Sequence, residues 1–308
     1  MRFILLLLSV ILLKFVSASV PAYGIWNGEE NDVIIGKLDY SDSPSYSKIF
    51  SLENSTLVSS NDNPLSTINR LTNTIYFITK NDANQDSLYL YSFDFESNQV
   101  QMVLEYLSSD LQIHAIESAQ TTNDLDLLIV YKSKIYQSQN YFVGSLSIQY
   151  GVPALYGPVT GNFLSATFNT DSQTIDVFSA SLNSNSLFIT SYALFGSSKA
   201  TQLKSSSNVK SGSLLTYSSS LSSLFSIANV NSKPSIINIK DGEISVLDWM
   251  NNNNPKQVQQ YSSMVFKYSS AYLSVTYSDG TFGLHVLNNY GLIATIQTPF
   301  LLNNYWFI

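Results

Sequence analysis

Residues 66–106 read STINRLTNTIYFITKNDANQDSLYLYSFDFESNQVQMVLEY. The stretch contains four short runs of β-forming, mostly apolar residues, and polar residues bound each run. The predicted strands are Ser66–Leu71, Thr74–Thr79, Ser87–Phe95 and Gln99–Tyr106. The polar segments at 80–86 and 96–98 are typical of hairpin loops. We therefore expect one antiparallel unit of four strands.

This pattern of turn and strand returns about every fifty residues. Apolar, β-rich runs begin at Ile75, Leu125, Ile175, Leu224 and Tyr272, and each follows a polar turn. A period of this length indicates stacked copies of one supersecondary unit, none of which can bury its apolar face alone.

The two ends of the chain supply the parts of one further copy. Tyr23–Trp26, Asp32–Tyr40 and Tyr46–Leu52 are three predicted strands without a first strand, and Leu301–Ile308 is one strand without followers. Pairing the last segment with the first three would complete a sheet, close a ring and hide two exposed strand edges.

Five full copies and one split copy resemble a six-bladed β-propeller. The predicted fold is all-β, with four-stranded antiparallel blades and a ring closed by pairing the C-terminal strand with the N-terminal blade. The sequence has no WD dipeptide, no di-glycine kelch signature and no complete Asp-box, so the resemblance names no specific family. A pair of two-sheet sandwiches or a β-solenoid is the alternative, but hairpin-linked strands at this period fit blades better.

Residues 1–18 have the pattern of a secretory signal peptide. Arg2 supplies the positive start, Phe3–Leu13 is apolar apart from one serine, and Val16-Ser17-Ala18 offers small residues for cleavage. We predict a secreted, extracellular protein with one propeller domain at 19–308 and no integral membrane segment after cleavage. An uncleaved anchor ending at Lys14 is the alternative.

The composition argues against several classes of partner. Charged residues make up 12% of the chain, the net charge is −7, and no cluster of Lys and Arg occurs. Nucleic acid and anionic membrane surfaces are therefore poor partners. There is no cysteine, which removes thiol chemistry and disulfides. Asn54-Ser55-Thr56 is a predicted glycosylation site at Asn54.

Loops between second and third strands share one propeller face with the connections between blades, and we expect a ligand on that face. Its acidic and aromatic residues are the candidate ligand-binding set: Trp26, Glu29, Glu30, Asp82, Asp86, Trp249 and Asp279. The segment Asp82–Asp86 also places oxygen ligands as a calcium loop does, but Ser87 and Phe93 replace the required Gly and Glu. We predict no metal site and no cofactor.

The two histidines, His114 and His285, lie inside predicted strands. Neither has a neighbouring sequence that supports a Ser-His-Asp triad, so both are interpreted as packed or surface residues and no catalytic residue is predicted. The alternative interpretation of His114 is that it faces the central channel.

These observations favour a non-enzymatic binding or adhesion module whose partner is an extracellular protein or a glycan. The alternative is a propeller hydrolase with a metal held in the central channel by Asp, Asn and Glu. Asn69, Glu117 and Asn162 are the polar candidates for that channel. A structural coat or matrix component is the third possibility.

Overall fold

The computed structural model describes residues 22–307 except 40–44, 61–62, 82, 122–125, 134–139, 182–183, 185, 195–196, 206–208, 232 and 251–256. The predicted signal peptide lies outside these residues. None of the helical structure in the part of the chain that is described has the length and apolarity needed to span a membrane.

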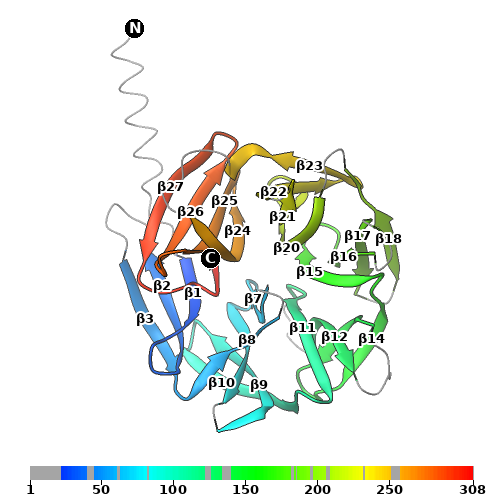
Figure 1. Cartoon of the computed structure of the whole chain (residues 1–308). Coiled ribbons are helices and arrows are strands. Elements are labelled where there is room, and N and C mark those ends of the chain that lie inside the picture. Colours follow the sequence, from blue (N-terminus) through cyan, green and yellow to red (C-terminus); the bar gives the residue numbers. More distant parts are fainter. Residues whose placement is uncertain are drawn as a thin grey trace, which may run out of the picture.

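Six antiparallel sheets stand around a central axis, as Figure 1 shows in a view down that axis. This confirms the predicted six-bladed β-propeller. The first blade joins β28 (Asn304–Phe307) to β1 (Ala22–Asn27), β2 (Val33–Asp39) and β3 (Ser45–Leu52). The second contains β7 (Ser66–Asn69), β8 (Thr74–Asn81), β9 (Asn84–Asp94) and β10 (Gln99–Leu107).

The other blades repeat this order from the axis outward. The third has β11 (Leu111–Ser118), β12 (Asp126–Ser133), β13 (Phe142–Ser147) and β14 (Pro153–Pro158), and the fourth has β15 (Asn162–Asn169), β16 (Thr174–Ala180), β17 (Leu187–Ala193) and β18 (Ser198–Gln202). The fifth has β20 (Val209–Ser218), β21 (Ser223–Val230), β22 (Lys233–Lys240) and β23 (Glu243–Leu247), and the sixth has β24 (Val258–Lys267), β25 (Ser270–Tyr277), β26 (Phe282–Asn288) and β27 (Gly291–Thr298).

The ring closes as predicted. β28 pairs with β1 in antiparallel register, with Ala22 opposite Phe307 and Ile25 opposite Asn304. Tyr305 and Leu302 are fully buried at this junction. The innermost strand of the first blade therefore comes from the opposite end of the sequence.

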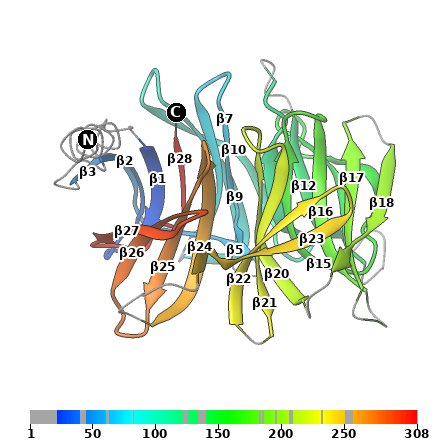
Figure 2. The same cartoon turned by 90° about the horizontal axis from the view of Figure 1, so that it is seen from above.

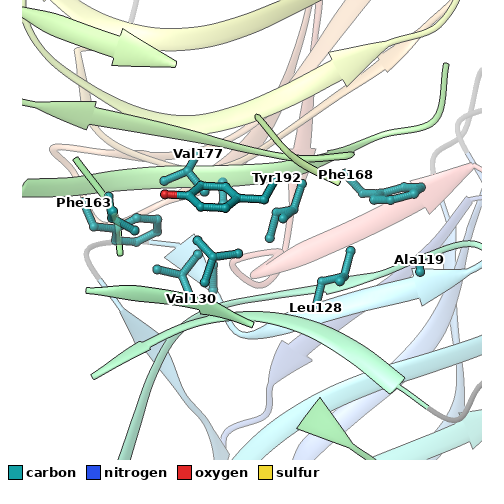
Figure 3. Packing of buried hydrophobic residues seen from close by; sticks show 12 residues of the cluster. Ala119, Leu128, Val130, Phe163, Phe168, Val177 and Tyr192 are labelled. Atoms are coloured by element: carbon teal, nitrogen blue, oxygen red, sulfur yellow. The ribbon is translucent and has the colours of Figure 1, made fainter. Parts of the chain in front are cut away.

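Each apolar core lies between two neighbouring blades. Figure 3 shows one such cluster, in which Val130 of β12 faces Val177 of β16 and Tyr192 of β17. Five further clusters fill the other junctions around the ring. A blade alone has no closed core, which is the physical reason for a sixfold repeat.

The connection between the first two blades contains strands that the sequence analysis did not predict. β4 (Ser55–Leu57) joins the edge of β8, and β5 (Ser59–Ser60) pairs with β6 (Asn63–Pro64). The β5–β6 pair contacts the innermost strands β11 and β24. The remaining small elements are β19 (Lys204–Ser205), which pairs with β23, and the single turn η2 (Asp248–Met250).

The strands run through the depth of the disc, as the side view shows (Figure 2). We call the side that carries the turns from first to second strands the turn face, and the opposite side, which carries the connections between blades, the connection face. Asp241 and Gly242 have positive φ angles of 52° and 80° and form the two-residue turn between β22 and β23 on the turn face.

Candidate functional site in the axial pocket

A pocket of about 210 Å3 lies on the propeller axis. All six innermost strands contribute to its wall, through β28, β7, β11, β15, β20 and β24. Described residues from every blade therefore meet at this pocket, although they are far apart in the sequence.

The pocket opens on the turn face. Its exposed lining residues, Arg70, Thr170 and Ser219, each follow the end of an innermost strand. At the other end Pro64 of β6 lines the pocket, and the β5–β6 pair spans from β11 to β24. The unpredicted hairpin thus covers the connection-face end of the axis, which makes the pocket one-sided.

Hydroxyl and amide groups tie the innermost strands to one another. Asn304 Nδ2 donates to Ser66 O at 3.1 Å, and Leu215 N donates to Ser165 Oγ at 2.9 Å. Innermost strands of neighbouring blades do not form a common sheet, so side chains provide these cross-links. This explains why the innermost strands are rich in Ser and Thr, and it leaves the pocket wall polar.

Glu117 is the one carboxyl group among the described residues that line this pocket. Thr67 Oγ1 donates to Glu117 Oε2 at 3.3 Å, and Ser118 N donates to Thr67 Oγ1 at 3.1 Å. Phe168 adds a backbone hydrogen bond from β15. Glu117 is therefore held by three blades, the second through Thr67, the third through its own strand and the fourth through Phe168.

Burial raises the pKa of Glu117 to about 8, and the hydrogen bonds from Thr67 and Phe168 only partly oppose this rise. A carboxyl group with a pKa near neutral can both accept and donate a proton under physiological conditions, which is the property of a general acid–base catalyst. Glu117 was one of the polar channel candidates, and the structure places it in the pocket.

The other two channel candidates do not line the pocket. Asn69 is fully buried beside it, where its amide donates to Thr121 O at 2.6 Å and its oxygen accepts from Leu71 N at 2.9 Å. Asn162 is exposed at the start of β15. The donor set for a channel metal is therefore incomplete in the described part of the chain, where no group of three or more His, Cys, Asp or Glu side chains converges.

None of the residues predicted to bind a ligand on the connection face lines the axial pocket. Glu29, Glu30, Asp86 and Asp279 are exposed, and Asp82 lies outside the described residues. The two tryptophans are packed instead. Trp26 is buried and stacks on Phe300 with ring centroids 4.0 Å apart, and the half-buried Trp249 packs beside Phe225 and Phe266. A ligand site at the acidic positions, like glycosylation at the exposed Asn54, stays a prediction.

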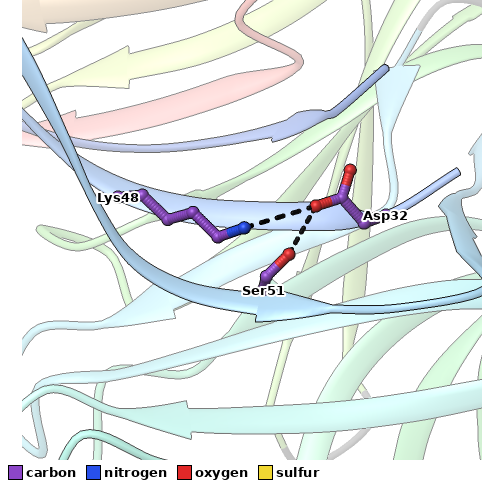
Figure 4. A network of polar contacts seen from close by, with 3 residues as sticks. All are labelled: Asp32, Lys48 and Ser51. Atoms are coloured by element: carbon purple, nitrogen blue, oxygen red, sulfur yellow. Dashed lines mark hydrogen bonds and ion pairs between the residues drawn. The ribbon is translucent and has the colours of Figure 1, made fainter. Parts of the chain in front are cut away.

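The acidic loop beside Trp26 includes one carboxylate with a structural role. Asp32 accepts a hydrogen bond from Ser51 and forms an ion pair with Lys48 at 3.6 Å (Figure 4). Lys48 is half exposed, so the ion pair adds little to the free energy of unfolding. The bonds fix the hairpin between β2 and β3.

The histidines are packed, and neither forms a triad. His285 Nε2 lies 2.9 Å from the hydroxyl of the buried Tyr277. His114 Nδ1 lies 2.6 Å from Ser60 Oγ of β5, and its Nε2 is buried without a partner. A triad needs a carboxylate on that second nitrogen. The Ser60–His114 hydrogen bond instead holds the β5–β6 hairpin, which covers the pocket, against β11.

We compared the chain with known proteins. No family model and no curated protein sequence matches it. Among solved structures it is similar to TolB from Acinetobacter baumannii, with 11% identity, a TM-score of 0.65 and coverage of 92% of this chain and 65% of TolB, so the chain spans about two thirds of TolB's length. It is also similar to the periplasmic gluconolactonase PpgL of Pseudomonas aeruginosa, with 10% identity, a TM-score of 0.56 and coverage of 94% and 98%. A putative 6-phosphogluconolactonase from Bacteroides uniformis gives 11% identity, a TM-score of 0.53 and coverage of 92% and 84%.

The prediction of a non-enzymatic binding or adhesion module is wrong. Propellers described as lactonases match the chain over 84–98% of their length, and the axial pocket carries a half-buried carboxyl group of shifted pKa. The sequence analysis named a propeller hydrolase only as the alternative. At these identities the likeness itself establishes the fold and not a substrate.

Proposed function

We propose that the protein is a propeller hydrolase that opens small sugar-derived lactones in its axial pocket, with Glu117 as the general base. The observation that carries the proposal is the position of Glu117, a half-buried carboxyl group in a polar pocket to which all six blades contribute. Two of the propellers of similar structure are described as a gluconolactonase and a putative 6-phosphogluconolactonase, which supports the choice of substrate.

The size and lining of the pocket fit such a substrate. Its volume of about 210 Å3 is below the 300–1,000 Å3 common for drug-sized ligands, so it suits one sugar unit rather than a polymer. Hydroxyl groups of Ser66, Thr67, Thr216 and Ser263 line it. These groups can exchange hydrogen bonds with the hydroxyls of a sugar.

The reaction needs one group that takes and returns a proton. The Glu117 carboxylate removes a proton from a water molecule while the water oxygen bonds to the lactone carbonyl carbon. The tetrahedral intermediate then collapses, the bond from that carbon to the ring oxygen breaks, and the Glu117 carboxyl returns the proton to the departing oxygen. The product is an open hydroxy acid, and Glu117 is regenerated as a carboxylate.

Hydrolysis of glucono-δ-lactone by the purified protein tests the proposal. Proton release is followed in weak buffer from pH 6 to 9.5, with spontaneous hydrolysis subtracted. Because the base must be ionised, kcat/KM should rise with pH and level off above about 8, the pKa of Glu117. Glu117→Gln should lower kcat about 100-fold or more. Glu105→Gln, an exposed glutamate on the outer strand β10, is the matched control and should leave the rate unchanged.

A second variant separates catalysis from folding. Thr67→Val removes the hydroxyl that lowers the pKa of Glu117, so the midpoint of the pH profile should move to higher pH. A purely structural role of Thr67 would leave the midpoint in place. Equal rates for the original protein and Glu117→Gln at every pH would refute the assignment of Glu117.

Secretion and extracellular location remain part of this proposal, on the pattern of residues 1–18. PpgL, one of the propellers of similar structure, is described as periplasmic, which is compatible with an enzyme outside the cytoplasm. N-terminal sequencing of protein recovered from medium would give a start after Ala18 if the signal peptide is cleaved.

A further inference from the structure

The axial pocket contains one cation as well as one acid. Among the described lining residues, Arg70 is the counterpart of Glu117, and the rest of the wall is uncharged. Arg70 follows β7 on the turn face, where it lies at the open end of the pocket, whereas Glu117 lies within β11. The two charges thus mark the entrance and the wall of one small cavity.

The backbone of Arg70 is fixed by the next blade. Arg70 N donates to Gln120 Oε1 at 2.9 Å, and Gln120 Nε2 donates back to Ile68 O at 2.5 Å. Asn69, which precedes Arg70, is fully buried and bonded to Thr121 O. The base of the arginine side chain is therefore anchored on both sides, which limits the entropy lost when its end group binds a ligand.

The guanidinium group of Arg70 has no partner in the described structure. The ion pair found among the described residues joins Lys48 to Asp32, and none of the carboxylates of those residues lies within ion-pairing distance of Arg70. Although the Arg70 side chain is exposed at the pocket mouth, partial desolvation by neighbouring atoms lowers its pKa, and arginine keeps its charge at any physiological pH. A partly desolvated cation with five hydrogen-bond donors and no acceptor is a ready site for an oxyanion.

A second group in the pocket also lacks a partner. Ser263 of β24 is 2% exposed, lines the pocket, and its Oγ makes no hydrogen bond in the structure. Buried hydroxyls are nearly always satisfied, and leaving one unsatisfied costs free energy. A ligand hydroxyl in the pocket would satisfy it.

We propose that the substrate carries an oxyanion, a carboxylate or a phosphate, that Arg70 binds at the pocket entrance while Ser263 receives a hydroxyl of the sugar body. The inference rests on the proposed function and narrows its substrate class to anionic sugar lactones. Arg70 acts here as a specificity residue, because it binds the oxyanion end of the substrate and does not touch the carbon that is attacked.

Three lactones of similar size test the inference. They are glucono-δ-lactone, which is neutral, 6-phosphogluconolactone, which carries a phosphate, and a glucaric acid lactone, which carries a carboxylate. The original protein should give a higher kcat/KM for at least one anionic lactone than for the neutral one. The anionic lactone with the higher kcat/KM shows whether Arg70 prefers a phosphate or a carboxylate. Arg70→Ala should raise KM for that lactone about ten- to a hundredfold and leave KM for the neutral lactone unchanged.

Two controls complete the experiment. Lys240→Ala removes one positive charge at an exposed position on β22 and should change no KM. Calorimetric titration with the stable products gluconate 6-phosphate and glucarate measures binding without catalysis. Glu117→Gln should still bind the preferred product, and Arg70→Ala should lose that binding.

The outcomes separate the two proposals. Binding of an anionic product that depends on Arg70, without hydrolysis of any lactone, keeps the oxyanion site and refutes the hydrolase. Hydrolysis of neutral and anionic lactones at equal kcat/KM, unchanged in Arg70→Ala, keeps the hydrolase and refutes the oxyanion site. Neither hydrolysis nor binding refutes both.

Discussion

At the scale of single residues, the environment of Glu117 favours proton exchange and opposes stability. Burial in the pocket disfavours the ionised carboxylate, and a hydroxyl and a backbone amide reduce this penalty only in part. In the proposed reaction this group acts as the base near neutral pH, and its charged form lowers the free energy of unfolding. Such a conflict is common where catalysis needs an unfavourable arrangement.

Glu117→Gln should make the protein more stable than the original at alkaline pH. The folded-state pKa of about 8 lies above the usual value of 4.5, so between these values the folded state binds more protons than the unfolded state. The free energy of unfolding of the original protein therefore falls as pH rises through this window. The glutamine variant lacks that loss and should gain about 2 kcal/mol at pH 8.5 relative to pH 5, after discounting for solvent in the pocket.

Urea unfolding of both proteins at pH 5, 7 and 8.5 measures this difference. Glu105→Gln again serves as the control, because Glu105 is exposed. A constant difference between the original protein and Glu117→Gln across the three pH values would contradict the raised pKa.

At the scale of elements, close packing between blades depends on positions that have no side chain. Gly212 of β20 lies against Phe178 of β16, and a Cβ added to Gly212 would meet Phe178 Cε1 at 2.1 Å. Phe178 is fully buried in the cluster between the fourth and fifth blades. The fifth blade can therefore approach the fourth only because residue 212 is a glycine.

Gly212→Ala should destabilise the protein by about 1–3 kcal/mol through overpacking of this junction. Phe178→Leu in the same chain frees space at the contact and should recover part of the loss, so the two substitutions are not additive. Chemical denaturation of the two single variants and the double variant measures the coupling. Additive losses would show that the contact between residues 178 and 212 is not the cause.

At the scale of the whole molecule, the closed ring depends on the pairing of β28 with β1. Tyr305 in β28 is fully buried, and its hydroxyl donates to Tyr272 O of the sixth blade. Leu302 is also fully buried beside this strand. A short C-terminal segment thus links the first and last blades to one another.

Tyr305→Ala should cost about 3–5 kcal/mol of unfolding free energy, as large-to-small changes of buried aromatics do. Tyr290→Ala is the matched control, because Tyr290 is 85% exposed at a turn. Thermal and urea unfolding compare the two variants. A loss equal to that of the control would mean that β28 contributes little to closure.

Much of the architecture follows from the sequence, because the repeat, the alternation within strands and the split blade are all local or periodic signals. The β4–β6 segment was missed because strands of two or three residues leave no periodic pattern. Glu117 could be named as a channel residue, but its pKa depends on Thr67 and Phe168 from other blades. Arg70 and Ser263 escaped notice because their lack of partners is a property of the assembled ring, although the position of Arg70 directly after an innermost strand is a usable signal.

The register that places Ala22 opposite Phe307 brings the two ends of the described chain within a few ångströms of each other. A short linker could covalently join them, and the polypeptide could then be opened elsewhere, for example between Pro158 and Asn162, where one blade gives way to the next. In such a circular permutant every blade would be built from consecutive residues. Its folding rate, compared with that of the natural order, would report how much of the barrier to folding comes from bringing distant termini together.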